Sequence, residues 1–156
     1  MSDIEILFRG QTRRKGEKVR LNGEPIDSNW VYGGIFPTKG DRALIYQFEP
    51  KIEKFPVYAD TVGMYTGLTD RNGTRVFEGD IVRFQFDNDD CPFPNKRTEK
   101  HIGRVFWQNF RSCFAIAMGK GGGDEINNDL WKYVQNGNRV EVIGNIHDNP
   151  ELLRGD

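Results

Sequence analysis

The stretch from Thr61 to Val82 constrains the fold of this chain more than any other segment. It places Asn72-Gly73 between two short runs rich in threonine, aromatic and β-branched residues. Asn-Gly readily adopts the positive φ angles of a tight hairpin turn. Gly79-Asp80 follows, and an aspartate carboxylate in such a turn can accept hydrogen bonds from nearby backbone amides. The stretch therefore predicts a β-hairpin, a second tight turn and the start of a further strand.

Similar short segments recur along the chain. In residues 81–86, for example, Val82, Phe84 and Phe86 alternate with Arg83 and Gln85, which is the period of a half-buried strand. Strands are predicted at residues 3–9, 30–36, 44–48, 62–68, 74–77, 81–86, 102–107, 113–118 and 139–146. Short strands at close spacing with glycine turns favour a mainly β fold of antiparallel strands.

Four segments do not fit this strand pattern cleanly. Asn22-Gly23 indicates a further hairpin, weakened by Pro25 in its second arm. The stretch between Pro50 and Pro56 is predicted to be irregular, and residues 126–133 fit either a helical turn or a strand. Asn149, followed by a proline and a glutamate, is typical of a helix start. At most one or two short helical turns are expected.

Composition limits the class of protein. The chain has 156 residues, of which 37% are hydrophobic and 29% charged, so it is too apolar for a disordered protein. No apolar run approaches the ~20 residues that a membrane span needs, and the first residues lack the pattern of a signal peptide. A soluble cytosolic protein is expected, with Cys91 and Cys113 as free thiols.

The charge distribution gives no overall signature of nucleic-acid binding. The net charge is −1 and the sequence pI is about 6.2. Six basic residues nevertheless fall close together, and a solvated loop is the favoured interpretation. They are Arg9, Arg13, Arg14, Lys15, Lys18 and Arg20. The acidic run at residues 87–90 is interpreted as a soluble loop, because its spacing is not that of a calcium-binding loop.

Several blocks, in order along nearly the whole chain, carry a resemblance to a known family. They are Ile6–Gly10, Trp30–Gly33, Thr61–Leu68 with Asp70 and Asn72-Gly73, Glu78–Val82, Gly103–Trp107 and Val140–Leu152. Together these blocks resemble the YopX family of phage and prophage proteins. The segments at 87–100 and 119–125 are where members of such a family would vary.

The resemblance implies a phage or prophage origin, and with it a location in the host bacterial cytoplasm, and a C-terminal half folded as an SH3-like barrel. It supplies no catalytic residues. With the strand pattern, it predicts an N-terminal β subdomain, residues 1–60, packed on a barrel subdomain, residues 61–156. One continuous domain over 1–156 is the alternative.

A search for catalytic or metal-binding patterns finds no strong candidate. Glu78 and Asp80 form a carboxylate pair, but their spacing in a turn gives no reason for a raised pKa, so a structural role is favoured. His101, His147 and the two cysteines do not have the paired spacing of a zinc site. Lys120–Gly123 is interpreted as a linker, because it lacks the remainder of a phosphate-binding loop. We therefore expect no catalytic residue, cofactor or metal, and a protein that is not an enzyme.

Aromatic residues are the remaining candidates. Small barrels bind peptides or single strands on exposed aromatic side chains. The aromatics considered are Trp30, Tyr32, Tyr65, Phe77, Trp107 and Phe110. Alternation places Phe84, Phe86 and Trp107 in the core. A core position is favoured for each ring taken singly, and Tyr32, Tyr65 and Phe110, near turn signals, are the exceptions most expected to be exposed.

Three functions follow as hypotheses. The first is a non-enzymatic phage or prophage accessory protein that binds protein, whether host, phage or itself, with a homo-oligomer favoured and no membrane partner. The alternative is a single-stranded nucleic-acid-binding protein that uses the basic stretch from Arg9 to Arg20. The second alternative is an enzyme of unrecognised type. The candidate interaction surface consists of Tyr32, Tyr65, Thr66, Phe110, Arg9, Arg13 and Arg14.

Overall fold

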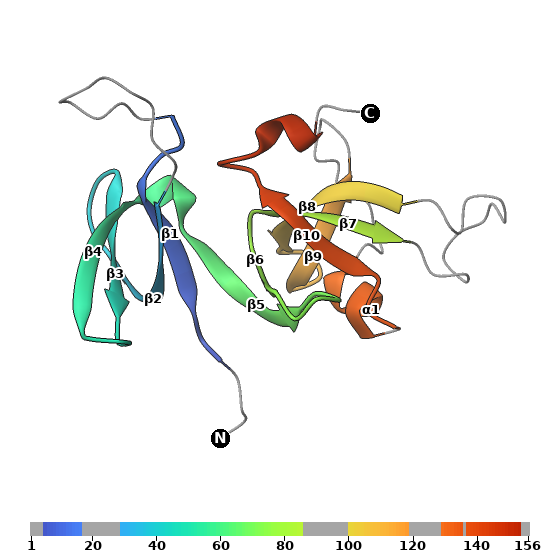
Figure 1. Ribbon diagram of the computed structural model, residues 1–156, viewed down its shortest axis with the longest axis horizontal. Helices are drawn as coiled ribbons and strands as arrows, with labels where there is room; N and C mark the ends of the chain where they lie inside the picture. The colour runs from blue at the N-terminus through green and yellow to red at the C-terminus, as the bar shows by residue number, and fades with distance from the viewer. Residues whose placement is uncertain (1–4, 17–28, 86–99, 119–128, 136, 154–156) are drawn as a thin grey trace, which may run out of the picture. The chain divides into compact units, whose positions relative to one another are not determined.

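The structure, a computed structural model, describes residues 5–16, 29–85, 100–118, 129–135 and 137–153. Strands dominate these residues (Figure 1). The strands are β1 (Phe8–Arg13), β2 (Asn29–Pro37), β3 (Arg42–Gln47), β4 (Glu53–Tyr58), β5 (Gly63–Thr69), β6 (Arg75–Phe77), β7 (Asp80–Gln85), β8 (Lys100–Gln108), β9 (Cys113–Met118) and β10 (Val140–Asn145). The helical elements are the 3-10 turns η1 (Ala59–Thr61) and η3 (Pro150–Leu153) and the short helix α1 (Leu130–Gln135).

The chain divides into two compact units, which we call unit 1 (Met1–Tyr65) and unit 2 (Thr66–Asp156). Unit 1 is an antiparallel ladder in the order β4-β3-β2-β1, joined on β1 by the first residues of β5. The ladder curls so that β1 meets β4: a Cβ added at Gly10 would lie 2.8 Å from Cγ2 of Val57. The core of unit 1 lies inside this curl and consists of Val31, Ala43, Ile45 and Val57.

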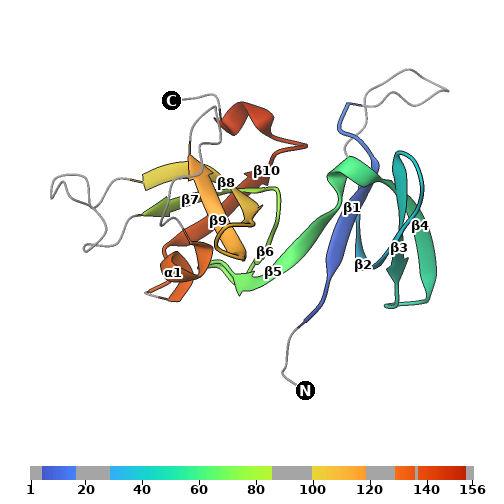
Figure 2. The ribbon, with the colours of Figure 1, turned by 180° about the vertical axis from the view of Figure 1, so that it is seen from behind.

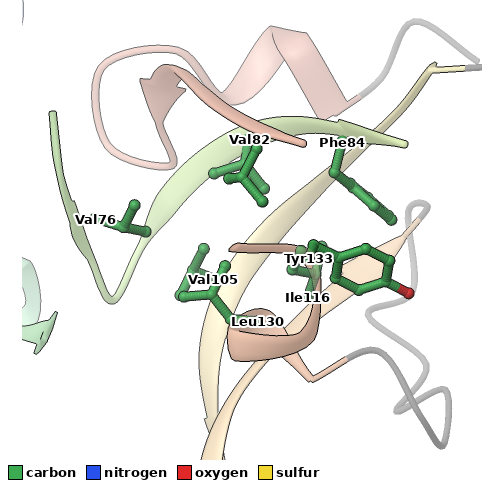
Figure 3. Close-up of a cluster of buried hydrophobic side chains, with 8 residues drawn as sticks. Val76, Val82, Phe84, Val105, Ile116, Leu130 and Tyr133 are labelled. Atoms are coloured by element: carbon green, nitrogen blue, oxygen red, sulfur yellow. The ribbon is translucent and has the colours of Figure 1, made fainter. Parts of the chain in front are cut away.

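Unit 2 holds the β5–β6 hairpin and a four-stranded antiparallel sheet in the order β10-β7-β8-β9. The strands β7 and β8 lie side by side in both views (Figures 1 and 2). The core of unit 2 consists of Val76, Val82, Phe84, Val105, Ile116, Leu130, Tyr133 and Val140. Figure 3 shows these side chains pointing toward one another, with the Phe84 ring directed at that of Tyr133 at a centroid distance of 5.1 Å. Full burial of one such side chain contributes about 1.5–3 kcal/mol relative to exposure.

The predicted fold class is confirmed as mainly β, with antiparallel sheets and only short helical segments in the described residues. Closure of unit 2 into an SH3-like barrel stays a prediction. The segment at 126–133, which was ambiguous, contains the start of α1. The hairpin predicted at Asn22-Gly23 lies outside the described residues.

Two predicted segments are wrong. The first strand occupies Phe8–Arg13, whereas residues 3–9 were predicted, because pairing with β2 and β5 begins at Phe8. The segment between Pro50 and Pro56 was predicted to be irregular, but it contains the first half of β4. Pro56 is accommodated there because β4 is an edge strand, and an edge strand leaves one side of its backbone without ladder hydrogen bonds.

The turns predicted in the Thr61–Val82 stretch are confirmed. Gly73 has a φ angle of 82°, and its N–H donates to Asp70 O at 3.0 Å, which closes the β5–β6 turn. Gly79 has a φ angle of 90°, and the buried carboxylate of Asp80 accepts a hydrogen bond from the Phe77 N–H at 2.7 Å. The sequence therefore specified the two turns as well as the strands that they join.

In the part of the chain that the structure describes, no helix is long and apolar enough to cross a membrane.

Candidate functional site

An exposed group of apolar side chains covers the outer side of the β2-β3-β4 ladder in unit 1. We call it the apolar face, and it consists of Tyr32, Phe36, Leu44, Tyr46, Phe48 and Pro56. Tyr32, Phe36 and Phe48 are 44%, 58% and 63% exposed. Such a concentration of exposed aromatic side chains is typical of an interaction surface.

Strand pairing makes the apolar face continuous. Residue Phe36 pairs with Leu44, which pairs in turn with Pro56, so the three side chains share one side of the ladder. A Cβ added at Gly34 would lie 3.8 Å from Cε2 of Phe48, so the Phe48 ring lies beside Gly34, between Tyr32 and Phe36 along β2. The alternate residues of these strands form the core on the other side.

Two of the predicted interaction residues meet on this ladder. Arg9 of β1 lies directly opposite Tyr32 of β2. The Arg9 guanidinium carbon lies 4.6 Å from the centroid of the Trp30 ring, a cation–π contact. The favoured interpretation of the basic stretch as a solvated loop is wrong for Arg9, which is buried and lies within a strand.

The other two arginines lie where β1 ends. Arg13, the last residue of β1, and Arg14 are exposed. Arg14 donates two hydrogen bonds to the Asp60 carboxylate, at 2.8 and 3.1 Å, and its guanidinium carbon lies 4.1 Å from the centroid of the Tyr58 ring. The Arg14 charge is therefore largely compensated within the chain.

Tyr65 was named among the rings most expected to be exposed, but the core position favoured for each ring is the one observed. Its side chain is buried, because β5 continues past Gly63 and Met64, which pair with β1, and the Tyr65 N–H donates to Leu7 O at 2.8 Å. Thr66 is half-buried, and its hydroxyl donates to Val76 O at 2.7 Å, which ties β5 to β6. Both residues therefore have structural roles.

Phe110 is 88% exposed at the β8–β9 turn, as predicted. Trp107 was predicted to lie in the core, but it is 44% exposed. It stands near the end of β8, beyond the core residue Val105, where its ring packs edge-on against Phe114 at a centroid distance of 5.1 Å. Phe84 is buried, as predicted, and Phe86 lies outside the described residues.

Unit 2 contains a cavity of about 450 Å³. Its cationic lining residues are Arg71, Arg83, Lys100 and Arg139, and Glu141 is the carboxylate among the described residues that line it. We call this cavity the cationic pocket. Sequence reasoning missed it because the four cations are separated by 12 to 39 residues, and only the outward position of Arg83 on its strand gave a signal.

The Glu78–Asp80 pair differs from its prediction in one respect. Burial raises the pKa of Glu78 above its ordinary value, whereas the spacing of the pair predicted no raised pKa. A half-buried carboxyl is less easily ionised because water no longer stabilises the charge fully. The Asp80 carboxylate accepts the hydrogen bond from the Phe77 N–H, so Asp80 has the structural role in the turn that was favoured.

The raised pKa predicts a pH-dependent effect of Glu78→Gln. A carboxyl with a raised folded-state pKa binds its proton more tightly in the folded protein, so its contribution to stability is present at low pH and is lost as the pH rises through that pKa. The variant is therefore expected to have a higher Tm than the parent at about pH 7, with the difference shrinking toward about pH 4. Thermal denaturation across this range measures the difference in Tm.

The matched control is Glu151→Gln, at an exposed carboxyl of the same unit. A lower Tm for Glu78→Gln at neutral pH would contradict this assignment.

Cys113 lies in a small polar cluster at the start of β9. Its Sγ lies 3.4 Å from Oδ1 of buried Asp129, whose carboxylate also accepts two hydrogen bonds from Arg111, at 2.9 and 2.7 Å. Burial, and then Asp129, raise the pKa of the Cys113 thiol. A thiol with a raised pKa is a weak nucleophile, so this cluster has a structural character.

The zinc hypothesis rejected on sequence grounds involved His101, His147, Cys91 and Cys113. Cys91 lies outside the described residues. Over the ranges that the structure describes, no three histidine, cysteine or acidic residues gather as a metal site. The Lys120–Gly123 segment is also outside the described residues.

The fold and these surfaces define a mainly β protein of two compact units, with an exposed apolar face on one and a cationic pocket on the other. The chain belongs to the YopX family, whose model, described as "YopX protein", matches residues 29–154. A search of curated proteins finds no match. The chain is also similar to a solved structure, the crystal structure of protein EF1440 from Enterococcus faecalis. The two are 18% identical, with 97% of this chain and 99% of that one covered and a TM-score of 0.47.

Proposed function

We propose that this protein is a non-enzymatic accessory protein of a phage or prophage, and that it works by binding protein through the apolar face of unit 1. The single observation that supports this proposal most is the continuity of that face across three paired strands. Aromatic side chains held rigidly on a sheet are the residues that contribute most to protein interfaces.

A second copy of the same chain is the proposed partner. Exposed residues of both signs of charge flank the apolar face. Arg42 and Lys54 are positive, and Asp41 and Glu49 are negative. A surface that carries both signs can be complementary to itself under two-fold symmetry. Pairing through the β4 edge is disfavoured because Pro56 lacks an N–H, so association of the two sheets face to face is expected.

Sedimentation velocity tests this proposal. Between about 5 and about 500 µM, the parent protein is expected to shift from monomer toward dimer, since compact exposed interfaces of this kind give micromolar association. The double variant Phe36→Ser/Phe48→Ser is expected to weaken association at least about tenfold, because it removes two central aromatic contacts.

The matched control is Phe110→Ser, which removes an even more exposed aromatic ring from unit 2. It is expected to leave the association unchanged. A monodisperse monomer at every concentration would contradict self-association, and an equal loss in Phe110→Ser would move the interface away from the apolar face.

Single-stranded nucleic-acid binding through the stretch from Arg9 to Arg20 is the second candidate. The contacts that favour it are the cation–π pairs of Arg9 with Trp30 and of Arg14 with Tyr58, since arginine–aromatic surfaces bind nucleic acids. It ranks second because Arg14 already pairs with Asp60. An enzyme of unrecognised type ranks third.

A further inference from the structure

The cationic pocket of unit 2 is assembled from four separate segments of the chain. Arg83 lies on β7, Lys100 begins β8, Arg139 precedes β10, and Arg71 lies in the β5–β6 turn. The Arg71 N–H donates to Val140 O at 2.9 Å, which holds this turn against β10. The pocket is therefore fixed by the same backbone hydrogen bonds that hold unit 2 together.

The pairing of the strands brings the cations together. Arg83 lies opposite Glu141 on β10, and Lys100 lies opposite Gln85, two residues farther along β7. Side chains of directly paired residues share one side of a sheet, as do residues two apart on one strand. The side chains of Arg83 and Lys100 consequently emerge on the same side of the sheet.

Arg139 is held in a defined orientation. Its Nη1 donates to Gln85 O at 3.0 Å, and its guanidinium carbon lies 5.4 Å from the centroid of the Tyr133 ring. Its backbone N–H donates to Tyr133 O at 2.9 Å. A guanidinium that is already oriented loses little further conformational entropy when it binds a ligand.

Among the described residues that line this pocket, cations outnumber carboxylates. Glu141 is the carboxylate among the described lining residues. Its Oε2 lies 3.9 Å from Nη1 of Arg83, so the two form a long and partly exposed ion pair. The excess is notable in a chain whose net charge is −1. Like charges held close together repel one another, and a bound anion relieves that repulsion.

We propose that the cationic pocket binds the phosphate groups of a nucleotide-sized ligand. Three of its four cations are arginines, whose planar, branched donors match phosphate oxygens. Its volume of about 450 Å³ exceeds what one inorganic phosphate needs and lies within the range of small-molecule sites. A free nucleotide and the backbone of a single-stranded nucleic acid both offer this chemistry. All of its described lining residues belong to unit 2, so the proposal does not depend on protein binding by the apolar face of unit 1.

The test measures binding of four probes to the full chain by isothermal titration calorimetry at low salt. The probes are ATP, inorganic pyrophosphate, a ten-residue oligothymidylate and a polyglutamate peptide. The double variant Arg71→Gln/Lys100→Gln changes two exposed side chains and is expected to weaken phosphate binding about tenfold or more. The control Arg75→Gln removes one positive charge at an exposed position of unit 2 that is not among the described lining residues, and its affinity is expected to stay within about twofold of the parent's.

Each outcome decides the proposal. Binding of ATP and pyrophosphate that is lost in the double variant supports a free nucleotide as the source of the phosphates. Binding of the oligothymidylate alone supports a nucleic-acid backbone. In that case the slope of the logarithm of the binding constant against the logarithm of the salt concentration should fall in magnitude by about one for each cation removed. No binding of any phosphate probe, equal binding of polyglutamate, or an equal loss in Arg75→Gln would overturn the proposal.

Discussion

Replacing Gly33 with alanine is expected to unfold unit 1. A Cβ at this position would lie 1.9 Å from the backbone oxygen of Tyr46 and 2.6 Å from its carbonyl carbon. Those atoms belong to β3, which pairs with β2 from the neighbouring residue Gly34 onward. The clash can therefore be relieved only by separating the two strands. Overpacking of this kind costs about 3 kcal/mol or more, which approaches the whole stability of a unit of this size.

The neighbouring residue provides a matched control. A Cβ at Gly34 would meet only Cε2 of Phe48, at 3.8 Å, which is an ordinary contact. Gly34→Ala is therefore expected to change the free energy of unfolding by no more than about 1 kcal/mol. Hydrogen exchange followed by mass spectrometry distinguishes the two variants: Gly33→Ala should lose protection over β2 and β3 while unit 2 stays protected. Equal protection in both variants would contradict the close approach of the strands at Gly33.

Replacing Asp70 with alanine is expected to destabilise unit 2 by about 3 kcal/mol or more. The buried Asp70 carboxylate accepts three backbone hydrogen bonds, each of 2.9 Å, from the N–H groups of Asn72, Thr74 and Val142. The first two close the β5–β6 turn, and the third joins this turn to β10, where the ladder with β7 shifts register. Alanine would leave three donors without their acceptor.

The variant Asp70→Asn separates loss of charge from loss of shape. With its amide oxygen in the place of Oδ1, asparagine keeps the two bonds of the turn but presents its NH₂ group to the Val142 N–H, so about half of the loss is expected. Urea-induced unfolding measures both variants through the fluorescence of Trp107 and Trp131 in unit 2, and a Trp30→Phe background removes the unit 1 signal. An unchanged urea midpoint in Asp70→Ala would show that the carboxylate does not hold β10 to the hairpin.

The sequence predicted the turns well because they depend on local chemistry. Gly73 and Gly79 adopt positive φ angles in the structure, as their turn positions require, and the Asp80 carboxylate bonds to a turn amide as expected. The two features predicted least well, the β4 segment and the position of Tyr65, depend on the rest of the fold. Pro56 stands in a strand only because β4 lies at an edge, and Tyr65 is buried although it lies near a turn signal.

The interaction surface could be predicted only in part. Tyr32 was found from its position near a glycine break, but Phe36 and Phe48 join it only through the register of β2 and β3. That register is set by pairing between strands, which single-strand alternation does not reveal. The same limit hid the cationic pocket, since Arg83 and Lys100 meet only once β7 pairs with β8.

Hydroxyl-radical footprinting of the aromatic side chains tests the proposed role of the apolar face most directly, because it reports the exposure of each ring in solution. Samples are compared at concentrations well below and well above the midpoint of association. The expected result is that oxidation of Tyr32, Phe36 and Phe48 falls in the concentrated sample, while oxidation of Phe110 does not change. Unchanged oxidation of all three rings, or a fall at Phe110 alone, would contradict the proposal that this face binds a second copy of the chain.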